Sequence, residues 1–84
     1  MEKRVIELLI LSPEKTLYNG TTERLLLPGE KAPFVVLYNH APIISSLGAG
    51  TVVWHTSQGE QSIAVSGGFA EVKENCVTVC VELI

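Results

Sequence analysis

The sequence predicts an all-β domain, a sandwich or flattened barrel of short strands. Near the end of the chain, apolar residues of one set (Val77, Val79, Val81 and Leu83) alternate with residues of a second set (Cys76, Thr78, Cys80 and Glu82), which is the period-two pattern of a strand. Turn-forming residues recur about every 8–12 residues, as in sandwiches and small barrels. No stretch of about ten residues repeats apolar side chains with a 3.6-residue period, so we expect no long helix.

The first part of the chain reads as strands separated by turns. Residues 4–11 are rich in β-formers and end at Ser12-Pro13. Residues 16–18 predict a short strand that closes at Asn19-Gly20, a strong hairpin dipeptide. A further strand is expected over residues 21–27.

Residues 27–50 form the stretch around which the chain is organised. Pro28-Gly29 is a turn signal, and apolar runs over residues 34–37 and 43–47 flank Asn39-His40-Ala41-Pro42. Pro42 lacks a backbone N–H and favours extended geometry at Ala41, so a bend is expected there instead of a helix.

The remaining residues predict two hairpins. Residues 51–56 and 61–66 flank the turn signal of residues 57–60, and residues 69–73 turn at Glu74-Asn75 into residues 76–83. Gly67-Gly68 between them predicts a kink or a bulge.

The composition indicates a single domain over residues 1–84 with an apolar surface. A chain of this length buries only about 60% of its unfolded surface, yet 46% of its residues are apolar and 18% charged. Some apolar side chains must therefore stay outside, and a contiguous patch of them would mark a protein interface.

Several classes of protein are disfavoured. The net charge is −3 and no Lys/Arg cluster is present to neutralise phosphates. No apolar stretch approaches the ~20 residues of a membrane helix, and no secretory signal peptide is evident at the N-terminus. Cys76 and Cys80 would lie about 13 Å apart on a strand, too far for a disulfide, and are interpreted as small buried hydrophobes.

Catalytic and cofactor chemistry is not indicated. Gly48-Ala49-Gly50 lacks the third glycine of a dinucleotide-binding loop, and no metal-ligand spacing is present. His40 could act as a base for Ser45 or Ser46, although its position beside a bend favours a structural role. Trp54 and Phe69 are expected to pack in the core, while Tyr38 is expected to be an exposed aromatic.

Four segments at compatible spacings resemble the N-terminal domain of the epsilon subunit of F-type ATP synthases. The segments are Ser12 to Gly20 (SPEKTLYNG), Leu27 to Gly50 (LPGEKAPFVVLYNHAPIISSLGAG), Val65 to Val72 (VSGGFAEV) and Asn75 to Val79 (NCVTV). The resemblance implies a two-sheet sandwich of about ten short strands. Ala32 and Val35 stand where the family usually has glycine.

The resemblance also implies a function. It implies a non-catalytic rotor subunit of the central stalk that packs on the gamma subunit and the c ring, and so couples ion-driven rotation to ATP synthesis. It places the protein at the cytoplasmic face of the bacterial inner membrane, peripherally, within the complex. The C-terminal helical hairpin of the family is not in this sequence, so its inhibitory and ATP-sensing roles are not carried over.

The candidate site residues are partner contacts, with no catalytic, cofactor or metal site expected. The loop Glu30, Lys31, Ala32 and Pro33 is expected to contact the ring, with His40 near the junction of gamma and ring, and Tyr38 is a further interface candidate. A small soluble β-sandwich module that binds a ligand or peptide, and a small hydrolase that uses His40, are the alternatives.

Overall fold

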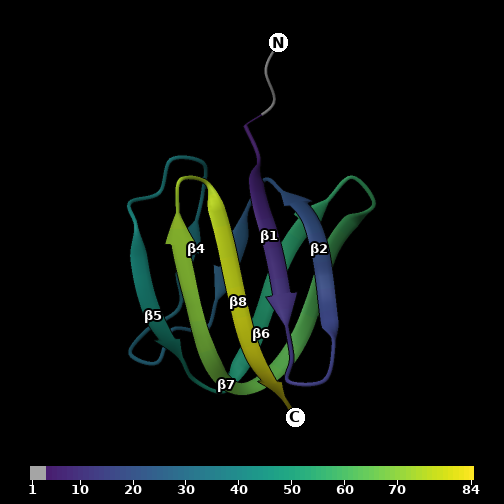
Figure 1. The fold of residues 1–84 in the computed structure, drawn as a ribbon, viewed down its shortest axis with the longest axis vertical. Coiled ribbons are helices and arrows are strands. Elements are labelled where there is room, and N and C mark those ends of the chain that lie inside the picture. Colours follow the sequence, from purple (N-terminus) through teal and green to yellow (C-terminus); the bar gives the residue numbers. More distant parts are fainter. Residues whose placement is uncertain (1–3) are drawn as a thin grey trace.

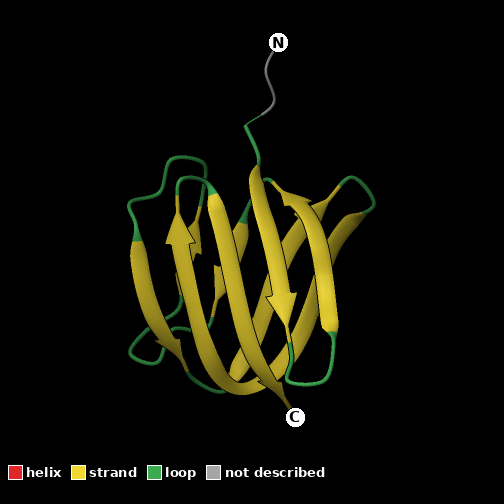
Figure 2. Cartoon of the chain, in the orientation of Figure 1, coloured by secondary structure: helices red, strands yellow, loops and turns green. Residues whose placement is uncertain are grey.

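A computed structural model describes residues 4–84, and within them the chain forms eight strands and no helix (Figures 1 and 2). The strands are β1 (Ile6–Leu11), β2 (Thr16–Thr22), β3 (Leu25–Leu27), β4 (Phe34–Val36), β5 (Ile43–Leu47), β6 (Gly50–Thr56), β7 (Gly59–Lys73) and β8 (Cys76–Leu83). The all-β prediction is therefore confirmed.

The strands form two layers that share one strand. In one layer β5, β7, β8, β1 and β2 lie side by side, and in the other β7, β6, β3 and β4 do so (Figure 1). All pairs are antiparallel except β1 with β8, which is parallel. The sandwich is thus one continuous hydrogen-bonded sheet folded over on itself.

The fold-over happens in β7, at the predicted glycine kink. Its first half pairs with β6, and its second half pairs with β8 and β5. The register with β8 shifts between Val65 and Gly67, and Gly68 has a φ of 144°. A Cβ on Gly68 would collide with the carbonyl oxygen of Cys80, so glycine is required there.

This bend accounts for one strand of the difference between the eight strands observed and the about ten short strands expected. The glycines bend the chain without ending its pairing, because Gly67 and Gly68 both keep partners in β8. The sequence pattern splits residues 61–73 into two strands, whereas the structure joins them in one strand of 15 residues.

The core fills the space between the layers. It is built from alternating positions on β1, β7, β8 and β6 together with residues of the short strands. Its buried members are Ile6, Leu8, Ile10, Leu25, Leu27, Val36, Leu47, Val52, Trp54, Val65, Ala70, Val72, Val77, Val79 and Val81. The predicted alternation of the last strand is confirmed for its three valines, while Leu83 at its end is exposed.

Both predicted later hairpins are confirmed. β6 and β7 are joined at Ser57-Gln58, and β7 and β8 at Glu74-Asn75. Glu74 and Asn75 have φ values of 50° and 62°, the positive values that a two-residue hairpin turn of matching twist requires.

The predicted hairpin turn at Asn19-Gly20 is wrong. Both residues lie inside β2 and pair with Leu9 and Leu8 of β1. The Tyr18 side chain lies across Gly20, where a Cβ would come within 2.7 Å of the tyrosine hydroxyl, and that hydroxyl donates a hydrogen bond to the Thr21 carbonyl at 2.7 Å. Glycine at this position makes room for an aromatic ring and does not form a turn.

Candidate functional site

The outer apolar patch is an exposed apolar surface on the layer that contains β1, β8, β7 and β5. We define it by five residues: Leu9, Leu11, Ile44, Phe69 and Cys80. Ile44 is 76% and Phe69 51% exposed, while the other three are half-buried. In a chain this small, such a contiguous surface is a candidate interface.

Strand register brings these residues together from four segments. Leu11 lies opposite Cys80, and Cys80 lies opposite Phe69. Leu9 and Ile44 lie in the adjacent row, separated by Thr78 and Glu71. Residues directly opposite on neighbouring strands project from the same face, and burial places this face on the outside of the layer, which is the layer in front in Figure 1.

A shallow hollow deepens one side of the patch. Its volume is about 320 Å³, and its walls include Leu11, Pro13, Phe69 and Cys80. An apolar concavity of this size can accept a side chain of another protein.

The face becomes polar toward the other ends of these strands. The next row contains Glu7, Cys76 and Lys73. The Cys76 thiol donates a hydrogen bond to the Glu7 carboxylate at 3.4 Å. This bond, with desolvation and the negative charges of Glu7 and Glu74, raises the pKa of Cys76.

Three sequence predictions on this face are wrong. Phe69 was expected in the core, and Cys76 and Cys80 were expected to be buried; instead Phe69 and Cys76 are exposed and Cys80 is half-buried. The reason is parity, since Ala70, Val72, Val77 and Val79 occupy the inward positions of the same strands. Both cysteines are free thiols.

The patch residues were missed at the sequence level, although one signal was present. The apolar run over residues 8–11 has no polar residue on its second face. Runs of this kind are typical of strands that are covered on both faces, and here the fold covers only the inner one.

The predicted loop residues lie next to the patch. The start of the loop is bonded to β5, since Gly29 bridges to Leu47 and the Glu30 N–H donates to the Ser46 carbonyl at 3.0 Å. Glu30, Lys31, Ala32 and Pro33 are all exposed. A hollow of about 310 Å³ has Glu30, Lys31, Ala32 and Ile44 among its lining residues, so the loop and the patch form one continuous surface.

Tyr38 and His40 lie elsewhere. The loop of residues 29–33 precedes β4 and residues 37–42 follow it, so the structure places the two groups at opposite ends of that strand. Tyr38 is 36% exposed, as predicted. The His40 N–H donates to the Leu37 carbonyl at 3.1 Å, and its Nδ1 lies 2.7 Å from the Ala41 carbonyl oxygen.

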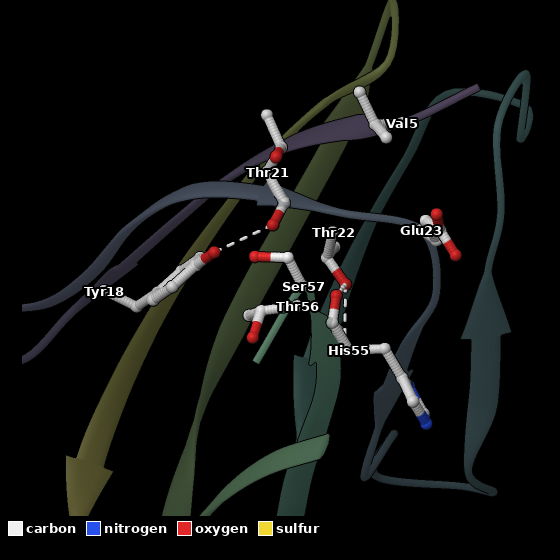
Figure 3. A pocket seen from close by; sticks show the side chains of 8 residues that line it. All are labelled: Val5, Tyr18, Thr21, Thr22, Glu23, His55, Thr56 and Ser57. Carbon is white, nitrogen blue, oxygen red and sulfur yellow. Dashed lines mark hydrogen bonds between the residues drawn. The ribbon is translucent and has the colours of Figure 1, made fainter. Parts of the chain in front are cut away.

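A separate polar hollow of about 180 Å³ lies where β2 meets the end of β6 (Figure 3). Thr22 is buried beside it, and its hydroxyl accepts the N–H of His55 at 3.0 Å and that of Arg24 at 3.3 Å. The same hydroxyl lies 2.8 Å from the carbonyl oxygens of both residues. These bonds close the edge between the layers, so this polar group serves the fold.

The His55 ring points away from the Tyr18 hydroxyl (Figure 3), and its Nε2 lies 3.2 Å from a Glu60 oxygen. This arrangement places the imidazole outside the polar network of Thr22.

The other residues considered for chemistry are not arranged for it. The Ser45 hydroxyl donates to the Ser46 carbonyl at 3.2 Å, and the His40 ring bonds Ala41. Trp54 is buried against Tyr18, with ring centroids 5.2 Å apart. Because Phe69 is on the outer surface, Trp54 and Phe69 do not form a shared stacking platform.

Residues 4–84 offer neither a metal site nor a membrane-spanning helix. Among these residues, no cluster of three or more His, Cys, Asp or Glu side chains could hold a metal ion. The same residues contain no helix long and apolar enough to cross a membrane.

Comparison with known proteins gives a consistent match. The family model for the "ATP synthase, Delta/Epsilon chain, beta-sandwich domain" matches residues 5–84. The chain is 41% identical over 70 residues to the ATP synthase epsilon chain of Leptospira borgpetersenii serovar Hardjo-bovis (strain JB197), covering 83% of this chain and 55% of that one. It is 45% identical over 74 residues to the chloroplastic epsilon chain of Tetradesmus obliquus, covering 88% and 54%.

The fold also matches a solved structure. A chain in the central stalk/c-ring structure of the Tetrahymena thermophila mitochondrial ATP synthase superposes with a TM-score of 0.77 at 17% identity, over 98% of this chain and 66% of that one. The sequence spans about half the length of the two epsilon chains described above.

Proposed function

This chain belongs to the delta/epsilon beta-sandwich family of ATP synthase, and from that premise we propose that it is a non-catalytic rotor subunit of the central stalk. In this role it packs on the gamma subunit and on the c ring, and it transmits rotation between them. The observation that carries the proposal is the outer apolar patch, because an isolated domain gains nothing from leaving Ile44 and Phe69 in water.

The patch suits the gamma subunit. Subunit contacts that persist through the life of a complex are more apolar than transient ones, and this is the apolar half of the outer face. Phe69 is the natural anchor, since aromatic side chains bury a large area with few rotatable bonds.

The loop of Glu30, Lys31, Ala32 and Pro33 suits the c ring. It is exposed, carries both signs of charge at its tip and continues directly from the patch through Ile44. One continuous surface can then contact two partners at once. Tyr38 and His40, at the other end of β4, are assigned to a second contact with the gamma subunit.

The proposed location rests on membership of the complex. Relatives occur in a bacterium and in a chloroplast, and in both settings ATP synthase is a membrane-associated complex. We place this chain at the cytoplasmic face of a bacterial inner membrane, held there through its partners.

A binding experiment on the patch tests the proposal. Phe69→Glu and Ile44→Glu place a charge that the partner must desolvate, so each should weaken binding to the purified cognate gamma subunit at least about tenfold, equivalent to about 1.4 kcal/mol. Calorimetry or surface plasmon resonance would measure the affinity, with the melting temperature as a check of folding.

Lys73→Glu is the matched control, because Lys73 lies on the same face of β7 but in its polar half. Equal losses in all three variants, or undiminished binding of Phe69→Glu, would remove the patch from the interface.

Substitutions in the other two regions test their assignments. Glu30→Lys should weaken assembly with the c ring and Tyr38→Asp should weaken assembly with gamma, while the isolated fold stays intact. Co-purification of the complex and ATP-driven proton pumping report both effects. Wild-type coupling and recovery in both variants would contradict the assignment of these residues to the interface.

A further inference from the structure

Asn75 connects three segments that are far apart in the sequence. Its side-chain Oδ1 accepts the Asn39 N–H at 2.6 Å, and its Nδ2 donates to the Asn39 Oδ1 at 3.2 Å. Its backbone carbonyl accepts the Glu7 N–H at 2.9 Å. The turn between β7 and β8 is therefore bonded both to the start of β1 and to the loop of residues 37–42, which lie at one end of the molecule (Figure 1).

The loop that Asn75 contacts needs this support. Leu37, Tyr38 and Asn39 are exposed, so little burial holds them in place. Asn39 has a φ of 66°, which is an uncommon conformation that asparagine tolerates better than most residues. A paired hydrogen bond from Asn75 to both the backbone and the side chain of Asn39 fixes this conformation from outside.

We propose that Asn75 is a positioning residue for the partner contacts at Tyr38 and His40. By clamping Asn39, which lies between them, it sets the direction in which the phenol and the imidazole leave the loop. The inference rests on the proposed function for its partner, whereas the clamp itself is a property of this chain. Asn75 needs no contact with the partner to act in this way.

Three substitutions distinguish the effect of the Asn75 side chain from the effect of the turn backbone. Asn75→Gly tolerates the positive φ and keeps the carbonyl that bonds Glu7, and it removes the whole side chain with its amide group. Glu74→Gly is the matched control, since Glu74 is the other positive-φ residue of the same turn. Asn75→Asp is the conservative variant, because it retains an acceptor for the Asn39 N–H and loses the donor.

Amide hydrogen exchange on the isolated chain tests the clamp. In Asn75→Gly, exchange at Asn39 should rise at least tenfold while exchange at Glu7 stays at its wild-type rate. In Asn75→Asp, protection at Asn39 should be partly restored, and Glu74→Gly should leave it unchanged. Wild-type protection of Asn39 in Asn75→Gly would overturn the inference, as would a loss of protection at both amides.

Binding to the gamma subunit tests the consequence. Asn75→Gly should lower the affinity for the gamma subunit, and Asn75→Asp should recover part of that loss. Faster exchange at Asn39 with unchanged affinity would overturn the positioning role. A wild-type chain that binds no gamma subunit would instead overturn the proposed function, and exchange alone would then decide whether the clamp exists.

Discussion

Cys76 is an exposed thiol whose chemistry is set by one neighbour. The Glu7 carboxylate accepts its hydrogen bond, and this bond favours the neutral thiol over the thiolate. Because the pKa of Cys76 is raised, less thiolate is present at a given pH than in a free cysteine. The residue is therefore accessible but slow to react.

Replacement of Glu7 should release this restraint. In Glu7→Gln the neighbouring negative charge is gone, so the pKa of Cys76 should fall and alkylation by iodoacetamide at about pH 8 should become faster. The rate should be measured in a Cys80→Ser background to isolate one thiol. In urea, where residue 7 and Cys76 are separated, the Glu7→Gln chain and the chain that keeps Glu7 should react at the same rate. Equal rates in the folded chains would contradict the role of Glu7.

Some residue-level features could not be read from the sequence. Asn19-Gly20 has the composition of a hairpin turn, but Tyr18 lies across the glycine and keeps it in a strand. The positive φ at Asn39 depends on Asn75, which is 36 residues away. Local patterns carry no information on contacts of this range.

At the scale of elements, β7 is the strand on which the architecture depends. It pairs with β6, β8 and β5 and changes layer at its glycines. Two glycines of this strand have positive φ, Gly59 at 111° in open space and Gly68 at 144° against the backbone of β8. Substitutions at these two glycines therefore separate the free-energy cost of a positive φ from the cost of a steric collision.

Alanine at these two positions should have unequal effects. Gly59→Ala should cost about 1–2 kcal/mol for backbone strain alone. Gly68→Ala adds a collision with the Cys80 carbonyl oxygen and should cost about 3 kcal/mol or more. Urea unfolding would measure both free energies. Equal costs would show that β8 moves aside without penalty.

The sequence identified most elements but not their partners. Alternating valines and turn residues predicted β8, both later hairpins and the kink of β7, because these features depend on neighbouring residues. The parallel pairing of β1 with β8 joins the two ends of the chain, and the division of β7 between two layers depends on three other strands. The pairing leaves no signal in any short stretch, and the division of β7 is marked only by the kink that Gly67-Gly68 predicts.

At the scale of the molecule, the two layers are joined at both sides. β7 connects them by continuous backbone, and Thr22 connects the corner after β2 to β6 by hydrogen bonds. A hydroxyl has one proton and donates to one carbonyl at a time, so the Thr22 hydroxyl alternates between the carbonyl oxygens of Arg24 and His55.

Removal of the Thr22 hydroxyl should open this second side. Thr22→Val keeps the shape and leaves buried polar backbone groups without their partner, which should cost about 1–3 kcal/mol. Thr51→Val is the control, since Thr51 is an exposed threonine of β6, and it should change stability by less than about 0.5 kcal/mol. Thermal unfolding would measure both, and equal stabilities would contradict the closing role of Thr22.

The candidate site was only partly predictable. The composition indicated surplus apolar surface, and the exposure of Tyr38 and of the loop from Glu30 to Pro33 was anticipated. The outer apolar patch was not, because its residues come from four strands and meet only through register. Phe69 has the composition of a core residue, and its outward parity is set by the bend two residues earlier.

The parallel pairing of β1 with β8 also determines when the protein can complete itself on the ribosome. β1 lies beside β8 in the middle of one layer, so this layer stays open until residues 76–83 have emerged. Until then β1 can pair only with β2, and the apolar residues on both of its faces stay exposed in the nascent chain. Contacts of such long sequence separation form slowly, so we expect the emerging polypeptide to depend on protection from aggregation until β8 has emerged.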